Sequence, residues 1–411
     1  MANLRAGLIG LGNMGRHHAR VLREIDGVDL VAVADPHGDP WGAAGRLEVL
    51  PDVESLVAAG IDMAVVATPT RFHEPLALAL AEAGVHTLVE KPVAADSAGG
   101  RRIAEAFEAA GLVGAVGHIE RFNPAIQEIR RRISIGELGE VFQITTRRQG
   151  PFPARIADVG VVKDLATHDI DLTAWVAQST YASVSAQVAH RSGREHEDMV
   201  LVTGRLANGI MVHHTVNWLS PLKERLTVVT GELGTIVADT QTADVIFYAN
   251  GTVRTEWDSV AAFRGVTEGD VIRYAFPKRE PLRSELEAFR DAVLGESDRT
   301  VSMAEGLATL EVAERILESA AAGGTLRLRV GTPWDFTRHF RLRSFEVAAQ
   351  PGGQARVGWS AVVAERCSDE ERRVEGHVEI RWSHGRFGGL PEAKVYLDSP
   401  ATAVPGYWPL T

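Results

Sequence analysis

The sequence predicts an α/β protein in three parts: a doubly wound parallel sheet, an α+β part with a mostly antiparallel open sheet, and a small β-rich extension. Apolar runs alternate with helical segments up to about residue 120, and strand-like segments joined by short turns follow. Gly and Pro punctuate the remainder. Because domains usually contain about 100–200 residues, a chain of 411 residues is expected to form two or three. We place the parts at residues 1–120, 121–330 and 331–411.

The first part is expected to be a parallel sheet with helices on both faces. Strands that alternate with helices are typical of βαβ units. Strands that are apolar throughout are typical of a sheet covered on both sides. The expected strands are residues 5–10, 28–34, 62–67, 86–89 and 112–117, and the expected helices are residues 16–25, 74–83 and 97–110.

The second part is expected to be a mostly antiparallel sheet with one embedded helix, residues 163–177. Its strands are expected at residues 141–147, 182–189, 199–206, 210–218, 224–230, 234–239 and 245–248. Two amphipathic helices, residues 281–294 and 303–322, are expected to close this part. The extension is expected to contain four short strands, at residues 344–349, 358–364, 374–382 and 393–397.

Composition and charge exclude several classes of protein. Apolar residues make up 45% and charged residues 24%, the proportions of a globular chain. A formal net charge of −11 argues against a nucleic-acid or anionic-membrane partner. Cys367 is the single cysteine, which favours a reducing compartment and excludes a thiolate metal cluster. No apolar run approaches the ~18 residues of a membrane span, and the first 15 residues lack a basic leader. We therefore expect a cytoplasmic protein without a metal.

A glycine-rich turn follows the first expected strand. Its G-x-G-x-x-G pattern opens a helix, and this context makes the pattern informative. In such a turn the first glycine permits the tight bend, the second lets a pyrophosphate approach, and the third lets helix and strand pack closely. The free N–H groups of the helix start would then face the phosphates. The residues of this predicted dinucleotide site are Gly10, Gly12, Asn13, Met14 and Gly15.

Asp35 ends the second expected strand, 20 residues after Gly15. A carboxylate at this position accepts hydrogen bonds from a ribose 2′-hydroxyl and repels a 2′-phosphate, so NAD is favoured over NADP. Thr68 and Pro69 follow the third strand, whose carboxyl end is expected to line the ligand crevice. The alternative is an ordinary glycine turn with Asp35 as a strand cap, but motif, order and spacing all favour the dinucleotide.

Glu90, Lys91 and Pro92 lie at the carboxyl end of another expected strand. Pro92 restricts the conformation of Lys91, which helps to direct the lysine into the crevice. There its ammonium group is able to bind a substrate hydroxyl and the nicotinamide ribose and to assist proton transfer. The alternative is a solvated surface lysine.

Asp164 and His168 are four residues apart in the embedded helix and should share one face. A carboxylate beside an imidazole orients the ring and stabilises its charged form, as a general acid/base histidine requires. The alternative, which spacing alone does not exclude, is a capped helix start with an exposed polar face.

Taken together, the glycine turn with its following helix (GLGNMGRHHAR, residues 10–20), the Glu-Lys-Pro strand end and the Asp-x-x-x-His helix resemble the Gfo/Idh/MocA oxidoreductase family. The resemblance extends over residues 1–330. It implies a Rossmann domain that binds NAD, an α/β domain whose open sheet assembles a homo-oligomer (a dimer or tetramer), and hydride transfer to or from a secondary alcohol of a sugar or cyclitol. The catalytic residues of the family correspond to Lys91, Asp164 and His168. In this mechanism Lys91 and His168 handle the hydroxyl proton and Asp164 orients them.

Two further segments, residues 117–124 (GHIERFNP) and 158–164 (DVGVVKD), resemble the branch that oxidises UDP-N-acetylglucosamine at carbon three. This resemblance implies a nucleotide-sugar substrate, and His118, Arg121, Asn123 and Arg148 are weaker predictions for substrate contacts. For Arg121 and Arg148, the alternative to a substrate contact is that each is an ion-paired arginine at the surface.

Two other functions remain open at this stage. One is a dehydrogenase or ketoreductase for an inositol, an aminosugar or a dTDP-sugar intermediate. The other is a dinucleotide-sensing regulatory protein without catalysis. Residues 331–411 lie outside the resemblance, and their role as an assembly element, a partner site or a lid is not specified by the sequence.

Overall fold

The computed structural model describes residues 3–153, 159–251, 267–328, 340–349, 355–365, 371–381 and 392–397. The chain divides into two compact units, Met1–Arg329 and Val330–Thr411. The predicted fold class is confirmed in both units.

The first unit begins with a six-stranded sheet of order β3-β2-β1-β4-β5-β6, and all of its strand pairs are parallel. Its strands are β1 (Leu4–Ile9), β2 (Val28–Ala34), β3 (Val49–Leu50), β4 (Met63–Val66), β5 (His86–Glu90) and β6 (Gly114–Gly117). The helices between them are α1 (Gly15–Glu24), α2 (Val53–Ala58), the short 3-10 turn η1 (Thr70–Phe72), α3 (His73–Glu82) and α4 (Ser97–Ala110).

This sheet is buried on both faces, as its apolar strands predict. Every residue of β4 is buried, and successive residues point to opposite sides. Val65 packs in a core with Leu22 of α1, whereas Val66 packs in another core with Leu80 of α3. Helix α8 (Pro281–Val293) also buries Phe289 in the core that contains Val65, although α8 lies in the expected second part of the chain.

A nine-stranded sheet of order β14-β13-β12-β11-β7-β10-β9-β8-β15 follows in the same unit. Only β7 and β10 pair in parallel within it, and the other pairs are antiparallel. Its strands are β7 (Val141–Pro151), β8 (Tyr181–Ala189), β9 (Met199–Leu206), β10 (Met211–Asn217), β11 (Leu219–Gly231), β12 (Gly234–Asp239), β13 (Asp244–Gly251), β14 (Thr267–Arg273) and β15 (Leu326–Arg327).

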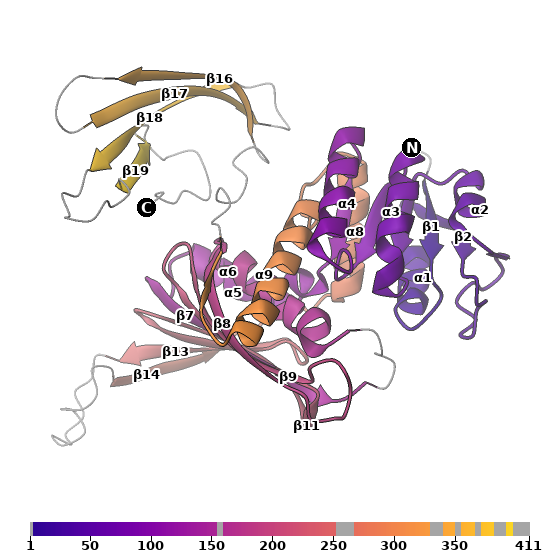
Figure 1. The fold of residues 1–411 in the computed structure, drawn as a ribbon, viewed down its shortest axis with the longest axis horizontal. Helices are drawn as coiled ribbons and strands as arrows, with labels where there is room; N and C mark the ends of the chain where they lie inside the picture. Colours follow the sequence, from indigo (N-terminus) through magenta and orange to yellow (C-terminus); the bar gives the residue numbers. More distant parts are fainter. Residues whose placement is uncertain are drawn as a thin grey trace. The chain divides into compact units, whose positions relative to one another are not determined.

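Helices cover one face of this sheet and leave the other face open (Figure 1). The covering helices are α5 (Pro124–Ser134), which follows the short 3-10 turn η2 (Ile119–Phe122), α6 (Thr167–Ala177), which follows a π-helical turn η3 (Val162–Ala166), and α9 (Met303–Ala322). Their apolar residues join those of the strands in one core. On the open face, Leu201 of β9 and Met211 of β10 are 43% and 47% exposed.

The second unit contains a four-stranded antiparallel sheet with its strands in chain order. The strands are β16 (Phe340–Ala349), β17 (Ala355–Glu365), β18 (Glu371–Arg381) and β19 (Glu392–Leu397). All four expected strands are present. Within the described ranges of the whole chain, none of the helices has the length and apolar character needed to cross a bilayer.

Candidate active site

The glycine turn between β1 and α1 has the geometry of a pyrophosphate cradle. Gly10 has a φ of +93°, and a Cβ there would lie 2.6 Å from the carbonyl oxygen of Ala67. A Cβ on Gly15 would lie only 1.9 Å from the carbonyl oxygen of Gly10, so this position requires close packing of helix and turn. A Cβ on Gly12, in contrast, would meet no atom within 4 Å. The turn is therefore filled at its two ends and open at its centre, where a dinucleotide phosphate would lie.

Asn13 and Met14 present backbone N–H groups at the start of α1 that make no hydrogen bond within the described chain. Such groups at a helix start bind phosphate readily. Beside them, the Asp35 carboxylate accepts hydrogen bonds from the backbone N–H groups of Leu11 and His37, both at 2.8 Å. Asp35 thus lies against the glycine turn and only partly buried, as the ribose-binding prediction requires.

Thr68 and Pro69 follow β4 at the same edge of the sheet. The Thr68 hydroxyl is buried and has no hydrogen-bond partner among the described residues. The backbone carbonyl oxygen of Thr68 lies 2.9 Å from His73 Nε2. His73 Nδ1 lies 2.8 Å from the carbonyl oxygen of Pro92, so this buried ring joins the segments after β4 and β5. An orphaned hydroxyl at this edge is suited to a cofactor.

Glu90 is buried and contacts a histidine of α1. Its Oε1 lies 2.7 Å from Nε2 of the fully buried His18 on α1. Burial alone would raise the pKa of Glu90, but the hydrogen bond and charge of His18, followed by the charges of Lys91 and His73, lower it instead. In the structure Glu90 ties the lysine-bearing strand end to α1, the helix that follows the glycine turn, and its role as a cofactor contact stays a prediction.

Lys91 and Asp164 join the two sheets of the first unit. Lys91 Nζ donates to Asp164 Oδ1 at 2.9 Å and to the Asp164 carbonyl oxygen at 2.7 Å. Both side chains are mostly buried, with 14% and 10% of their surface exposed. The peptide bond between Lys91 and Pro92 is cis. Lys91 and Asp164, two of the three residues that the family resemblance assigns to catalysis, are therefore in direct contact.

His168 lies in the first turn of α6, four residues after Asp164, but no hydrogen bond joins the two side chains. The expectation that Asp164 orients His168 is therefore wrong for this structure, because the Asp164 carboxylate binds Lys91. His168 Nδ1 is buried and has no partner among the described residues. Burial, and then the charges of Lys91, Arg148, His118 and Arg225, lower the pKa of His168 well below its usual value. The ring is accordingly neutral, and Nε2 is the nitrogen left for a ligand.

A π-helical turn, η3, accounts for this arrangement. Residues 162–166 do not follow the α-helical spacing that the sequence prediction assumed, and π turns inside helices recur at functional sites. Glu197 fixes the start of the turn, because its carboxylate accepts from Val162 N at 2.9 Å and its carbonyl oxygen from Val161 N. The predicted segment also includes Asp158, which lies outside the described residues.

The four residues that were weaker predictions for substrate contacts are all buried polar residues. Arg121 binds both oxygens of Asp171, and it also contacts Glu305. Arg148 binds Asp169 and Glu120 at 3.0 and 2.8 Å. Asn123 caps α5 and donates to a backbone carbonyl, and neither ring nitrogen of His118 has a hydrogen-bond partner among the described residues. Both guanidinium groups are engaged by carboxylates, and a substrate role for these four residues stays a prediction.

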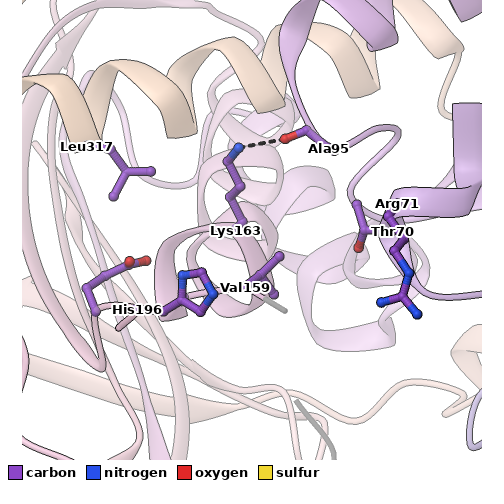
Figure 2. Close-up of a pocket in the computed structure, with 9 residues that line it drawn as sticks. Thr70, Arg71, Ala95, Val159, Lys163, His196 and Leu317 are labelled. Carbon is purple, nitrogen blue, oxygen red and sulfur yellow. Dashed lines mark hydrogen bonds between the residues drawn. The ribbon is translucent and has the colours of Figure 1, made fainter. Parts of the chain in front are cut away.

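A cavity of about 260 Å³ lies beside the π turn (Figure 2). Thr70, Arg71 and Ala95 line it from the first sheet's loops, and Lys163 of η3 and His196 of the loop between β8 and β9 line it from the other side. Lys163 Nζ donates to the carbonyl oxygen of Ala95 at 2.6 Å and bridges the two sides. Lys91, Asp164 and His168 are not among the lining residues, so the cavity adjoins the predicted catalytic group without containing it.

Comparison with known proteins agrees with this geometry. A family model described as "Oxidoreductase family, NAD-binding Rossmann fold" matches residues 4–118, and a "GFO/IDH/MocA C-terminal domain" model matches residues 126–237. The chain therefore belongs to the Gfo/Idh/MocA oxidoreductase family, and its first domain is an NAD-binding Rossmann domain. The expected family and the expected NAD-binding domain are thereby confirmed, and the reaction itself stays a prediction.

Individual relatives differ in their substrates. "Inositol 2-dehydrogenase 4" from Saccharopolyspora erythraea is 36% identical over 51% of this chain and 65% of its own length. "UDP-N-acetylglucosamine 3-dehydrogenase" from Acidithiobacillus ferrooxidans is 32% identical over 52% of this chain and 66% of its own length. The chain thus spans just under two thirds of these two relatives. A solved structure of the Acidithiobacillus enzyme superimposes with a TM-score of 0.67 and 25% identity, covering 78% of this chain and 99% of that one.

Proposed function

We propose that this protein is an NAD-dependent dehydrogenase that oxidises a secondary alcohol of a sugar, with a nucleotide sugar such as UDP-N-acetylglucosamine, oxidised at carbon three, as the favoured substrate. The observation that carries the proposal is the meeting of Lys91 with Asp164 beside a neutral, partly exposed His168, at the edge of the sheet that bears the NAD turn. A dinucleotide sensor without catalysis has no need of this group.

Proton transfer is the task of the protein side chains in this mechanism. Bound NAD supplies the hydride acceptor. The neutral His168 ring accepts the proton of the substrate hydroxyl through Nε2, while the Lys91 ammonium group donates a hydrogen bond to the same oxygen. Asp164 holds Lys91 through its carboxylate and its carbonyl oxygen, so the lysine is positioned before substrate arrives.

Two relatives support different substrates. The nucleotide-sugar assignment is supported by the Acidithiobacillus enzyme, which is similar in sequence and over nearly its whole structure. An inositol is the second candidate, because the Saccharopolyspora inositol dehydrogenase has the higher identity of the two. Free aminosugars and dTDP-sugars are further substrates to include in a test.

The substrate is tested by following NADH absorbance with the purified full chain. UDP-N-acetylglucosamine, myo-inositol, glucosamine and a dTDP-sugar are supplied with NAD, and the largest kcat/KM is expected for the UDP-sugar. A preference for inositol would replace the favoured substrate, and no NAD reduction with any of them would contradict the dehydrogenase itself. Lys91→Ala and His168→Ala variants that bind NADH but do not turn over would exclude a pure sensor.

We also propose a cytoplasmic homo-oligomer, a dimer or tetramer, formed through the open face of the nine-stranded sheet. Met211 and Leu201 lie on this face, on adjacent strands, and further apolar side chains continue it at Tyr248 and Val271. An apolar sheet face of this kind gains by pairing with a second copy. Light scattering on the full chain tests the assembly, and a monomer would contradict it.

A further inference from the structure

Arg225 occupies a distinctive position on β11. In the sheet register it lies opposite Arg148 of β7, on the face that α6 covers. Its side chain is half-buried. Nη1 donates to two backbone carbonyl oxygens, those of Gln149 and Glu224, both at 2.7 Å. A guanidinium group is therefore fixed in a definite orientation beside the predicted active site.

In the described part of the chain, no carboxylate contacts the guanidinium group of Arg225, in contrast to that of Arg148. Arg148 binds both Asp169 and Glu120, whereas Arg225 forms no ion pair with any residue of the described chain. Its Nε and Nη2 atoms make no hydrogen bond there, and they are not among the buried atoms without partners. These donors consequently remain open to solvent and to a ligand.

The carboxylates near Arg148 form no hydrogen bond or ion pair with Arg225. Asp169 Oδ2 and Glu120 Oε2 are buried and make no hydrogen bond among the described residues. Asp164, the third nearby carboxylate, is bound to Lys91. These acids stabilise the Arg225 charge only from a distance. Burial and then the charge of Arg148 outweigh them and lower the pKa of Arg225 to about 10.

Arg225 also lies near the predicted base, because its register partner Arg148 binds Asp169, the residue that follows His168 in α6. A half-buried cation with free, coplanar donors is the geometry that binds a phosphoryl or carboxylate group in two-point fashion. Such an anion would supply the contact that Arg225 does not find among the described residues.

We propose that Arg225 binds an anionic substituent of the substrate, a phosphoryl or carboxylate group, and so selects charged sugars over neutral cyclitols. This inference rests on the proposed function, since it assigns a substrate class to the same site. A diphosphate of a nucleotide sugar and the carboxylate of a sugar acid share the required chemistry.

Binding to the enzyme–NADH complex of the full chain tests this proposal without turnover. UDP and D-glucuronate are titrated separately by calorimetry against the wild type, Arg225→Gln and Arg225→Lys. Arg205→Gln is the control, because Arg205 is exposed on β9 of the same sheet and its guanidinium bonds only a backbone carbonyl among the described residues. A hydrogen bond to a charged group is worth ~1.5–3 kcal/mol, so Arg225→Gln is expected to weaken binding by roughly 10- to 100-fold. Arg225→Lys should recover part of that affinity, and Arg205→Gln should bind as the wild type does.

The two ligands distinguish the sources of the anion. Weaker binding of UDP alone assigns a phosphoryl site, and weaker binding of glucuronate alone assigns a carboxylate site. The proposal is overturned if the wild type binds neither, or if Arg225→Gln binds both as the wild type does. Unchanged NADH affinity and thermal midpoint in the variants exclude misfolding as the cause, and Arg225→Lys provides the comparison if Arg225→Gln is unstable.

A kinetic measurement adds a second criterion. The ratio of kcat/KM for UDP-N-acetylglucosamine to that for myo-inositol should fall in Arg225→Gln, because only the UDP-sugar loses a contact to its anionic group. A changed pKa of His168 would affect the oxidation of both substrates equally and would therefore leave the ratio unchanged. An equal loss with both substrates would contradict anion binding. Failure of the proposed function has a different signature, namely no NAD reduction by the wild type with any sugar.

Discussion

We expect Asp35 to determine cofactor choice through its carboxylate at the end of β2. In the structure this group accepts hydrogen bonds from Leu11 and His37 and lies partly exposed beside the glycine turn. Asp35→Asn keeps an acceptor for Leu11 but removes the charge that repels a 2′-phosphate. We expect the ratio of kcat/KM with NAD to that with NADP to fall by about tenfold or more. An unchanged ratio would refute the role of Asp35. Asp35→Ala removes the acceptor for Leu11 N as well, so comparing it with Asp35→Asn shows how much the glycine turn depends on that hydrogen bond.

His168 should set the acid side of the pH profile. Burial and neighbouring positive charges lower the pKa of His168, so the ring stays neutral as the pH falls through the range in which an ordinary histidine becomes protonated. Alcohol oxidation needs the neutral ring, so kcat/KM should stay level down to about pH 6.5 and decline only well below it.

Removal of this ring should lower kcat by about 10²–10⁴, the usual contribution of a positioned proton-transfer group. His168→Ala is compared with His190→Ala, whose ring is exposed in a loop. NADH binding should persist in both variants. A loss of less than about threefold in His168→Ala would show that the base lies elsewhere.

Single residues were predictable where a short motif fixes them. Lys91, Asp164 and His168 follow from local patterns, and the structure brings Lys91 and Asp164 into contact. The partner of Asp164 was not predictable, because the π turn replaces the α-helical spacing. Arg225 has no local signal either, since its position depends on the pairing of β11 with β7.

In the turn between β1 and α1, we expect one glycine to be needed for cofactor binding and another for folding. A Cβ on Gly12 meets no protein atom within 4 Å, whereas a Cβ on Gly15 collides with the carbonyl oxygen of Gly10. Gly12→Ala should therefore keep the thermal midpoint of the wild type and weaken NADH binding by about tenfold or more, because the methyl group occupies the phosphate position. Gly15→Ala should lower the midpoint by several degrees. Fluorescence titration and thermal unfolding check both, and unaltered NADH affinity in Gly12→Ala would argue against the cradle.

Helix α8 contains a buried glutamate, Glu285, whose ionisation lowers the stability of the fold. Glu285 is 2% exposed, and neither carboxylate oxygen has a hydrogen-bond partner among the described residues. Burial, and then the charges of Glu90 and Asp171, raise its pKa well above the usual value. The folded state thus holds a proton that the unfolded chain has already released, and stability falls as the pH rises above the ordinary glutamate range.

Glu285→Gln removes this loss because the amide does not ionise. The variant should unfold a few degrees higher than the wild type near pH 8, and the difference should vanish near about pH 4. Glu287→Gln on the same helix is the control, since Glu287 binds Arg283 at 2.9 Å and gains nothing from neutralisation. A pH-independent difference in midpoint between Glu285→Gln and the wild type would contradict a protonated Glu285.

Secondary structure was most predictable where the periodicity is long and the ends are marked. α4, capped by Asp96, and α9, with its Ser302 and Glu305 capping box, have the predicted bounds. Helix α5 was missed, although Asn123 and a proline at its first turn are a helix-start signal.

At the scale of the whole molecule, the sequence predicted the class of each sheet but not how the last helices are shared between them. Helix α8 buries Phe289 against the parallel sheet, while Ile316 of α9 packs in the core of the nine-stranded sheet. Amphipathic periodicity identifies an apolar face and does not specify the surface that covers it. The expected domain boundary near residue 120 therefore stays a prediction.

The compact unit Met1–Arg329 contains the NAD turn, the Lys91–Asp164 pair and Arg225, and β15 completes the nine-stranded sheet at one edge. A chain that ends at Arg329 is therefore expected to fold, to bind NADH with the affinity of the full chain, and to keep kcat within about threefold. If the open sheet face assembles the oligomer, light scattering should report the same oligomeric state for the shortened and full chains. Loss of folding or turnover would show that residues 330–411 complete the enzyme. A shift to monomer with activity retained would instead assign assembly to those residues and contradict assembly through the sheet face.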